Sequence, residues 1–525
     1  MLFRLLALAS AKGTVRIERA VVLFACVLFA VQGLLFVPLA GVQQDEAAFS
    51  APLYQPMYGY QEVSIFGKPY PLMLVNYLGT VKTWIYAPMF KLLGISVWTV
   101  RVPVIVFGSL TVYLFWHLLR RSIGPRAAMV GCLLLATDTT FLLTIVFDWG
   151  PVVLQHLLMV AGLLLLLRFC ESGQVWWLGA GFLLFGLAIW DKAVFVWMLA
   201  GLAAGAALVY PRELVRAGRG RTLLIACAVF LVGASPFLLY NIQHRSQSVG
   251  SMVRLSSAEF GAKLAMVPRA AGGSALLTYI PASPEPKPPS TMDLVITCGY
   301  GAALLVGLVY GRRPFWFSLV ALLAAWLLMA FTRNAGGSAH HTILLWPMPC
   351  LMVAAAFAGA PEKLPRRVSG GVLAAVVAVL CCGHLWATCQ NYAALVRRGT
   401  SAIWSDAILK LPAELKPLHA SHVVAADWGM IDNLILLSGG ELPVRGGVDL
   451  FTDKPEAKER EAIEYYLDSP GTLILSYADE QEISPGRNRR VREMAASAGF
   501  QLELVDTVFD RKGRAVYVIW RPRRR

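Results

Sequence analysis

Residues 20–46 read AVVLFACVLFAVQGLLFVPLAGVQQDE, an apolar stretch that ends at the acidic pair Asp45-Glu46. About 20 apolar residues are enough to cross a bilayer as a helix. Four basic residues precede the stretch, which indicates a cytoplasmic N-terminus and a retained span, not a cleaved signal peptide. A charged group in hydrocarbon costs about 2.5 to 3.5 kcal/mol. We therefore expect Asp45-Glu46 to face water, a partner or a substrate.

The composition is that of a polytopic membrane protein. Hydrophobic residues make up 57% of the chain, charged residues 15%, and the mean hydropathy is +0.60. The net charge of +15 could indicate nucleic-acid binding, but the basic residues form short clusters between apolar runs, as topology signals do. We therefore expect no nucleic-acid partner. The nine cysteines lie in or beside apolar runs, and their spacing indicates neither a disulfide framework nor a metal site.

Eleven apolar segments are long enough to be membrane spans. They lie near residues 18–40, 97–119, 126–147, 150–169, 175–190, 193–210, 222–241, 291–310, 314–332, 342–360 and 369–390. Clusters of arginine and lysine occupy alternate loops, which places those loops in the cytoplasm by the positive-inside rule. An odd number of spans puts the C-terminal region on the outer side of the membrane.

A shorter apolar segment at residues 79–94 is interrupted by Lys82, Pro88 and Lys91. Counting it as a span would invert every later loop, so we interpret it as a helix at the outer interface. The topology then brings the charged residues of the bundle to one non-cytoplasmic face. These are Asp45, Glu46, Lys68, Lys82, Arg101, Asp148, Asp191, Lys192, His340 and His341. The alternative for each is a side chain that simply reaches water at the interface, and it is strongest for Lys68 and His341.

Two domains are predicted, a membrane bundle at residues 1–392 and a soluble α/β domain on the outer side at residues 393–525. The second is polar, with short apolar runs between helical stretches. The runs lie at 422–426, 472–475 and 515–520, and the helical stretches at 454–467 and 488–498.

Residues 242–290 are predicted to form a long outer loop, either a lid or a connector, because the prolines between 281 and 289 exclude a regular helix there. The glycines at 440–447 lack the Gly-Lys-Ser or Gly-Lys-Thr of a phosphate-binding loop and are interpreted as turns. Nucleotide hydrolysis is therefore not expected.

Short motifs follow one another along the bundle in a fixed order. They are Asp45-Glu46, YLGTVKTWIYAPMFKLLG at 77–94, Arg101-Val-Pro103, Asp148-Trp-Gly-Pro151, Asp191-Lys192 and His340-His-Thr-Ile-Leu-Leu-Trp-Pro347. In this order the chain resembles the membrane glycosyltransferases that use polyprenyl-phosphate sugars. These form the GT-C superfamily, with the protein O-mannosyltransferases and the lipid A aminoarabinose transferases. The resemblance covers residues 18–390.

The resemblance implies a GT-C-like bundle of about eleven transmembrane helices, with interfacial helices in the first outer loop and a C-terminal domain in the periplasm. It implies a multi-pass protein of the bacterial inner membrane. The implied reaction is inverting transfer of a sugar from a polyprenyl (undecaprenyl) phosphate to an acceptor hydroxyl on protein, lipid A or polysaccharide. The sugar and the acceptor are not specified by the motifs.

The resemblance also implies roles for the carboxylates. Such a transfer needs a carboxylate to take the acceptor proton and cations to stabilise the departing phosphate. Asp45 is the implied general base or acceptor-binding acid, Glu46 supports it, and Asp148 is a second essential carboxylate. A divalent cation near these carboxylates stays open, since some members of the superfamily need one, but no ligand spacing indicates it.

Five residues are candidates to bind the donor phosphate. Lys82 and Arg101 are the main ones, and Lys192 and His340 are secondary contacts. The family often carries Lys-Pro-Pro ahead of the interfacial helix, whereas here Lys68-Pro-Tyr-Pro71 lies further upstream, so Lys68 competes with Lys82 for this role. Relatives often have Thr-Lys-Gly-Pro where this chain has Asp191-Lys192, so only the lysine carries over.

Two other classes of function remain as alternatives. A transporter or flippase of a lipid-linked sugar would also need charges in the membrane, but transporters more often show paired half-repeats and charges at mid-membrane. A scaffold whose outer domain binds envelope partners would need no catalytic residues. Product formation by purified protein in detergent, with no second compartment, separates the enzyme from a transporter. Retention of function after substitution of Asp45 would favour the scaffold.

Overall fold

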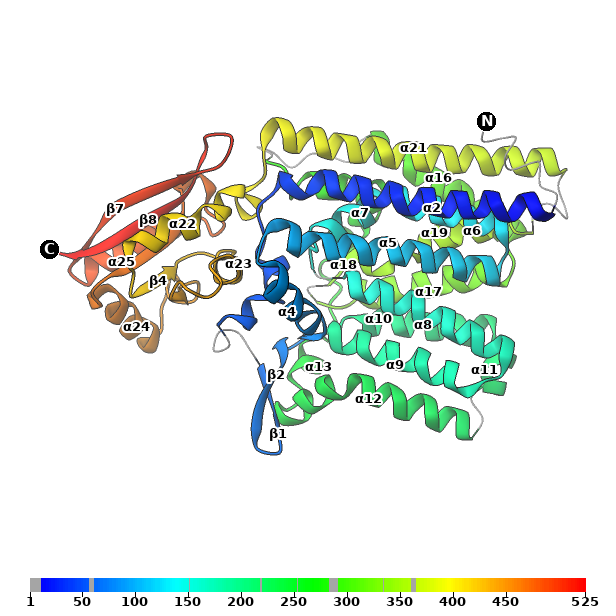
Figure 1. The fold of residues 1–525 in the computed structure, drawn as a ribbon, viewed down its shortest axis with the longest axis horizontal. Coiled ribbons are helices and arrows are strands. Elements are labelled where there is room, and N and C mark those ends of the chain that lie inside the picture. The colour runs from blue at the N-terminus through cyan, green and yellow to red at the C-terminus, as the bar shows by residue number, and fades with distance from the viewer. Residues whose placement is uncertain are drawn as a thin grey trace.

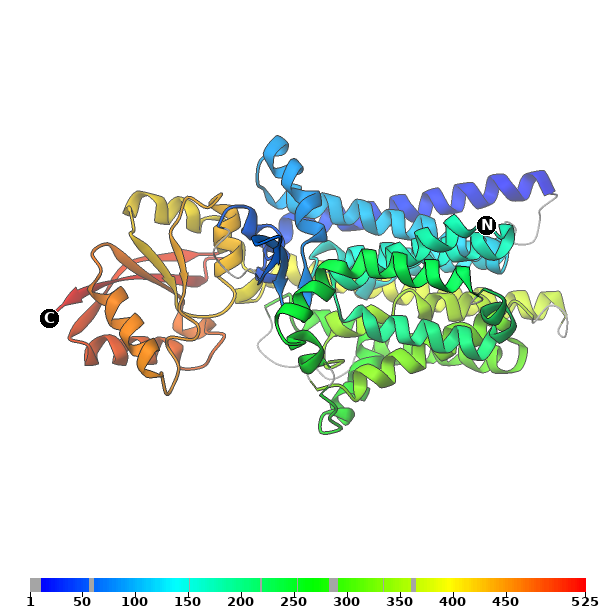
Figure 2. The same cartoon turned by 90° about the horizontal axis from the view of Figure 1, so that it is seen from below.

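The structure is a computed structural model that describes residues 11–55, 61–150, 152–217, 220–252, 254–282, 291–333, 335–359 and 365–525. A bundle of helices forms one end of the molecule and a smaller sheet domain forms the other (Figures 1 and 2). The long helices of the bundle are α2 (Ala11–Phe36), α5 (Val97–Ser122), α8 (Val153–Ser172), α9 (Val175–Asp191), α10 (Phe195–Val209), α12 (Arg221–Gln243), α16 (Thr291–Tyr310), α17 (Arg313–Ala330) and α21 (Arg366–Arg398).

The described residues contain seven helices long and apolar enough to cross a membrane, or nine if two bent pairs count as single spans. The bent pairs are α6 (Pro125–Thr137) with α7 (Thr139–Val146), and Ala339–Leu345 with α19 (Met348–Ala356). The other two predicted spans correspond to the shorter apolar helices α9 and α10. The chain is therefore a multi-pass membrane protein, and the crossings by α9 and α10 stay predictions.

The loop between α2 and α5 is more structured than expected. It contains α3 (Gln44–Ala47), the three-stranded antiparallel sheet β1 (Gln61–Ile65), β2 (Lys68–Val75) and β3 (Leu78–Gly79), and then α4 (Val81–Leu93). The sheet was not predicted, because the prolines at 69 and 71 disfavour a central strand. Here they lie on a strand whose hairpin is held at the end of α12, where the Gln243 amide pairs with both backbone groups of Ser64. Helix α4 lies at the end of the bundle near the sheet domain (Figure 1).

Residues 242–290 also differ from the predicted loop. They include α13 (Gln247–Met252), α14 (Phe260–Gly272) and α15 (Ser274–Leu277). Residues 283–290, where most of the prolines lie, are outside the described residues.

The C-terminal part contains a five-stranded sheet in the order β5-β4-β6-β8-β7. Its strands are β4 (His422–Ala425), β5 (Val444–Gly446), β6 (Thr472–Tyr477), β7 (Phe500–Phe509) and β8 (Ala515–Arg524). Strand β4 runs parallel to β5 and β6, and β8 runs antiparallel to β6 and β7. The three predicted strands and both predicted helices, now α24 (Ala457–Asp468) and α25 (Arg487–Ser497), are present, whereas β5 and β7 were not predicted.

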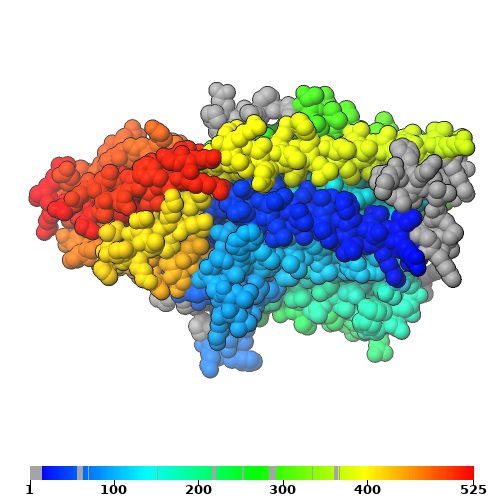
Figure 3. Space-filling view, turned by 45° about the horizontal axis from the view of Figure 1, so that its top comes forward, coloured from blue at the N-terminus to red at the C-terminus, as the bar shows by residue number. Residues whose placement is uncertain are grey.

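The sheet is buried on both faces, and one face joins the bundle. Alternate residues of a strand point to opposite faces. Val424 packs against α24 and α25, while Val423 and Ala425 belong to the apolar core that continues into the bundle. The junction is therefore a packed interface. Figure 3 shows the C-terminal domain seated on the end of the bundle, with α2 and α21 side by side along it. The predicted boundary at residues 392 and 393 lies inside α21 and stays a prediction.

Candidate functional site

Glu46, on α3, forms a buried ion pair with Arg101. Arg101, on α5, donates from Nε to Glu46 Oε1 at 2.6 Å and from Nη2 to Glu46 Oε2 at 2.9 Å. Its other three N–H groups donate to the carbonyl oxygens of Val37, Ala40 and Gly41 at 2.6 to 2.9 Å. A guanidinium has five N–H groups, so every donor of Arg101 is used.

This pair fixes the end of the first span. The carbonyl oxygens after α2 have no partners within the helix, and a buried carbonyl without a partner is costly. Glu46 Oε2 also accepts from the backbone N–H of Gln43, which closes the first turn of α3. We call Arg101 and Glu46 the clamp. A phosphate could reach Arg101 only by displacing one of these bonds, so the partners of Arg101 do not support its predicted role in donor binding. The Glu46 carboxylate is likewise occupied by Arg101, so its contacts do not support a direct role beside Asp45.

Lys82 and Asp148 form a second buried pair. Lys82 lies on α4 and donates from Nζ to Asp148 Oδ2, and both side chains are almost fully buried. The rings of Phe49 and Tyr86 each lie 4.9 Å from Nζ. Asp148 Oδ1 is buried and has no hydrogen-bond partner among the described residues. Unlike the clamp, this pair has hydrogen-bonding capacity left for a ligand.

The backbone around Asp148 has a special conformation. Asp148 follows α7 with a φ of +43° and Gly150 has a φ of +68°. Positive φ is disfavoured for residues with a Cβ, and such strain is found most often at functional sites. The turn aims the Asp148 carboxylate at α4.

Lys192 and His340 pack against the same turn. Lys192, immediately after α9, donates from Nζ to the carbonyl oxygen of Gly150. His340, on α18 (Ala339–Thr342), lies so close that a Cβ at Gly150 would come within 2.8 Å of its ring. The ring of Trp149 lies 4.6 Å from that of His340. The structure thus brings Lys82, Asp148, Lys192 and His340 together from four segments.

Asp45 lies beside this group on α3, half-buried. Burial raises the pKa of its carboxyl group, and the positive charge of Lys192 opposes that rise. Burial lowers the pKa of Lys82 to about 8, against the charges of Glu46 and Asp191. Burial likewise lowers the pKa of Lys192 to about 8, against the charges of Asp45 and Asp191. Carboxylates and ammonium groups therefore share one partly dry site.

The structure does not bring Lys68 to this group. Lys68 is exposed beside the turn of the β1–β2 hairpin, next to Phe66, which is 100% exposed. In Figure 1 this hairpin projects sideways from the end of the bundle. Lys82, and not Lys68, is therefore the lysine at the cluster.

Within the described residues, no group of three or more His, Cys, Asp or Glu side chains is arranged to hold a metal ion. Asp148 is instead paired with an ammonium group, and Glu46 with a guanidinium. Carboxylates that are already paired with cationic side chains do not fit a divalent cation.

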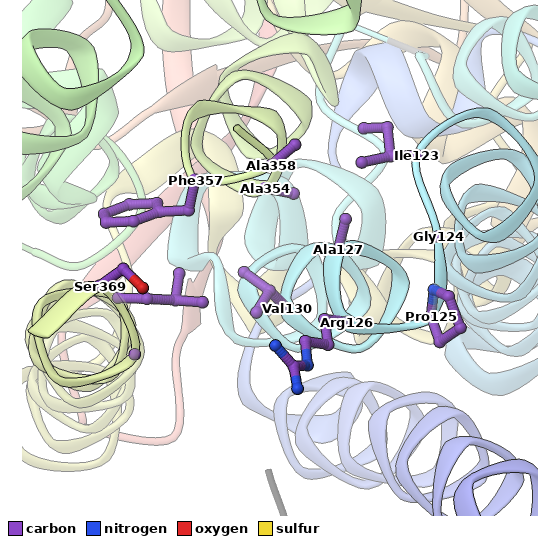
Figure 4. Close-up of a pocket in the computed structure, with 12 residues that line it drawn as sticks. Ile123, Gly124, Pro125, Arg126, Ala127, Val130, Ala354, Phe357, Ala358 and Ser369 are labelled. Atoms are coloured by element: carbon purple, nitrogen blue, oxygen red, sulfur yellow. The ribbon is translucent and has the colours of Figure 1, made fainter. Parts of the chain in front are cut away.

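Two cavities lie at the opposite end of the bundle. One, of about 360 Å³, is lined by the starts of α6 and α21 and the end of α19 (Figure 4). The other, of about 780 Å³, is mainly apolar and lies between the ends of α5, α8 and α10. The loops at this end carry the arginine clusters that predict the cytoplasmic side.

A buried polar network that was not predicted lies at the breaks of both bent helix pairs. Asp138 ends α6 and accepts from the backbone N–H of Phe141 and from Trp346 Nε1, both at 2.8 Å. His384 Nε2 on α21 lies 3.6 Å from the same carboxylate. On one side of the two breaks, α7 leads directly to Asp148 and the segment Ala339–Leu345 contains His340. No sequence signal identified the network. Asp138, Trp346 and His384 are 38 to 246 positions apart in the sequence and share no motif.

Comparisons with known proteins identify related families and folds. The model of the dolichyl-phosphate-mannose-protein mannosyltransferase family matches residues 79–240. The crystal structure of ArnT from Cupriavidus metallidurans bound to undecaprenyl phosphate superposes with a TM-score of 0.62 at 14% identity, covering 97% of this chain and 98% of that chain. The chain has the GT-C fold. The resemblance inferred from the motifs, and the predicted fold class, are confirmed.

Other comparisons define the extent of the likeness. ArnT in the apo state gives the same TM-score, identity and coverage. The arabinofuranosyltransferase AftD from Mycobacteria gives a TM-score of 0.55 at 14% identity, covering 95% of this chain and 40% of that chain. A sequence comparison with curated proteins gave no match. The GT-C family match contains Lys82, Arg101, Asp148 and Lys192, whereas Asp45 lies before it.

Proposed function

We propose that this protein is an inverting glycosyltransferase that moves a sugar from a polyprenyl phosphate to an acceptor hydroxyl at the outer face of a bacterial inner membrane. The observation that carries the proposal is the buried Lys82–Asp148 pair with its unpartnered carboxylate oxygen, next to Asp45 and Lys192. The solved ArnT structure holds undecaprenyl phosphate. We extend that class of ligand to this chain.

In the proposed reaction the acceptor oxygen attacks the anomeric carbon of the sugar. Asp45 takes the proton of the acceptor hydroxyl, and its raised pKa makes it a stronger base than an exposed carboxylate. The bond between the anomeric carbon and the phosphate oxygen breaks, and its electron pair leaves on the polyprenyl phosphate. One displacement of this kind inverts the configuration at the anomeric carbon.

Lys82 and Lys192 supply positive charge where the phosphate departs. A cation in a site with little water stabilises developing negative charge more strongly than it would in bulk water. The backbone turn at Asp148 holds both lysines, since Lys82 bonds to its carboxylate and Lys192 to the carbonyl of Gly150. Asp148 therefore acts by orienting Lys82 and by offering Oδ1 to the sugar.

The test uses purified protein, undecaprenyl-phosphate sugars, and lipid, protein or polysaccharide fractions of the envelope as acceptors. Release of free undecaprenyl phosphate reports transfer whichever sugar is used. Wild type should release it with at least one sugar and acceptor fraction, and Asp45→Asn and Asp148→Asn should not. Full activity in both variants contradicts the assignment. Because a detergent solution has no second compartment, product formation there also excludes a transporter.

Two further measurements define the finer points. The anomeric configuration of the product, determined by NMR, should be opposite to that of the donor. Mass spectrometry of lipid A, surface polysaccharide and secreted proteins from a deletion strain should show the loss of one sugar from the natural acceptor.

A further inference from the structure

The C-terminal domain reaches the acidic loop through one short helix. Helix α23 (Ile431–Leu437) packs on α3, and the side-chain oxygen of Gln44 accepts from the backbone N–H groups of Ile431 at 3.0 Å and Asp432 at 3.3 Å. Asn433 Nδ2 donates to the carbonyl of Val42 at 3.2 Å. These contacts fix the first turn of α23 against the residues that immediately precede Asp45.

Other contacts hold the domain in this orientation. Arg511, in the turn between β7 and β8, donates to the carbonyl oxygens of Pro38, at 3.0 Å, and Leu39. The backbone N–H of Gly41 donates to the carbonyl of Trp404 at 2.8 Å, and a Cβ at Gly41 would collide with Ser405. The position of α23 next to Asp45 therefore follows from several independent bonds.

Asp432 is the carboxylate that this arrangement brings to the site. It is half-buried, and the hydrogen bond that holds it in place among the described residues is that of its backbone N–H to Gln44. Burial and the negative charge of Asp45 raise its pKa to about 7. Asp148 Oδ1 and Asp191 Oδ1 are both buried and unpartnered within the described residues. Asp148 pairs with Lys82, and Asp191 interacts with Lys82 and Lys192, the lysine whose charge also acts on Asp45.

The other charged groups near α23 are already paired or lie at its edge. The elements packed against it bring Asp45 and Glu46 from α3, Arg445 from β5, Glu414 from α22 (Leu411–Leu415), and Asp406 from the turn at Asp406–Leu409. Glu46 is held by Arg101, Asp406 lies 3.5 Å from Arg511, and Glu414 is exposed. Arg445 donates to the carbonyl oxygen of Val444 at 2.8 Å. The charge that raises the pKa of Asp432 is that of Asp45.

We propose that Asp432 of the C-terminal domain is a residue of the acceptor side of this site and donates a hydrogen bond there from its protonated carboxyl group. The inference rests on the proposed function. Two carboxyl groups that face one dry site ionise one after the other, because both negative charges together are disfavoured. Asp45, ionised, takes the proton of the acceptor hydroxyl, while Asp432 keeps its own proton and orients the acceptor oxygen.

The test compares wild type with Asp432→Asn and Asp432→Ala in the undecaprenyl phosphate release assay between pH 5.5 and 8.5. Wild-type transfer should fall as pH rises through about 7, because Asp432 loses the donated proton. Asn keeps an N–H donor that does not titrate, so Asp432→Asn should lack this fall. Asp432→Ala should be about tenfold slower than Asp432→Asn at every pH, and about tenfold slower than wild type below pH 7, the effect of one lost hydrogen bond. Lys82 and Lys192 remain in all three proteins, so the difference between profiles isolates Asp432.

A second measurement does not depend on transfer. A raised carboxyl pKa means that the folded protein binds more protons than the unfolded chain, so the stability from Asp432 is lost as pH rises from about 4 to 7. The thermal midpoint of wild type relative to Asp432→Asn should fall over that range. The exposed Asp468→Asn serves as the control in both assays and should match wild type.

The outcomes separate the two proposals. Identical pH profiles for wild type and Asp432→Asn, or full activity of Asp432→Ala, overturn the role of Asp432 while leaving the glycosyltransferase intact. A thermal difference that is constant with pH overturns the shared ionisation even where no acceptor supports transfer. Absence of release by wild type with every sugar and fraction contradicts the proposed function instead.

Discussion

The Arg101–Glu46 clamp and the Lys82–Asp148 pair are two buried ion pairs at the same end of the bundle, and they differ in what they leave free. Every N–H of Arg101 has a partner, whereas Asp148 Oδ1 has none among the described residues. A saturated pair stabilises the fold and offers nothing to a ligand. An unsaturated pair retains an uncompensated group, which substrate can satisfy. Burial and charge alone would have given both pairs the same role.

The largest effect expected is on transfer by Lys82→Met. Loss of the cation should lower the rate by about 10³-fold, since removing one group that stabilises developing charge typically costs about 10² to 10³. Met keeps the apolar contacts with Phe49 and Tyr86. The thermal midpoint should fall because the buried Asp148 carboxylate loses its partner, so the rate is measured at a temperature where the variant is folded. Undecaprenyl phosphate release measures the rate and thermal unfolding the stability. Lys91→Met, exposed on the same helix, is the matched control and should be fully active.

Arg101→Lys should show the opposite pattern. A lysine cannot form five bonds in a fork, so buried carbonyls and Glu46 would be left without partners, at a cost of about 3 kcal/mol of stability. The thermal midpoint should fall by several degrees, while the protein that remains folded still binds undecaprenyl phosphate in native mass spectrometry. Loss of undecaprenyl phosphate binding at unchanged stability would instead support the predicted role of Arg101 in binding the donor phosphate. Arg313→Lys, an exposed arginine paired with Glu213, should behave as wild type.

pH should separate the two pairs without a mutation. Guanidinium groups keep their proton up to pH 10, but the pKa of Lys82 and that of Lys192 are lowered to about 8. Transfer should therefore drop about tenfold between pH 8 and 9 as the phosphate-binding charge is lost. Stability should change in the other direction, because a lysine whose folded pKa is depressed releases its proton more readily in the folded state. Parallel loss of both would mean that the lysines are structural.

The smallest effect is expected from Trp346→Phe. It removes the 2.8 Å bond to Asp138 and leaves the ring, at a cost of about 1 kcal/mol. Because the two broken spans that carry Asp148 and His340 meet at this bond, transfer should fall about fivefold with undecaprenyl phosphate binding almost unchanged. Trp386→Phe, exposed on α21, is the control. An unaffected rate would show that the pair at Asp148 holds its geometry without the network.

The sequence was sufficient for the features that depend on local pattern. Apolar segments located the spans, and the interruption of residues 79–94 by lysines and proline separated α4 from them. The order of the motifs selected the residues that now lie together at Lys82, Asp148, Lys192 and His340. These features are carried by consecutive residues, so one sequence contains them.

Pairing could not be predicted in the same way. Arg101 is 55 positions from Glu46. Nothing in either motif shows that all five N–H groups of this arginine donate to a carboxylate and three carbonyl oxygens. Asp432 lies in a domain with many acidic residues and no motif, and only the docking of α23 distinguishes it. The β1–β3 sheet was not predicted because the prolines at 69 and 71 are more typical of a loop than of a central strand.

Some of the hydrogen bonds to the carbonyl oxygens of residues 37–41 can form only when synthesis of the chain is almost complete. Three of them are held by Arg101 and two by Arg511, which is 472 positions from Leu39. A ribosome synthesises the first span and its acidic loop at the start of translation, and the arginine that caps them almost at the end. During that interval the loop with Asp45 exists without the domain that packs against it. A chaperone or protease that acts on unfinished membrane proteins would therefore find this loop accessible until the C-terminal domain has folded.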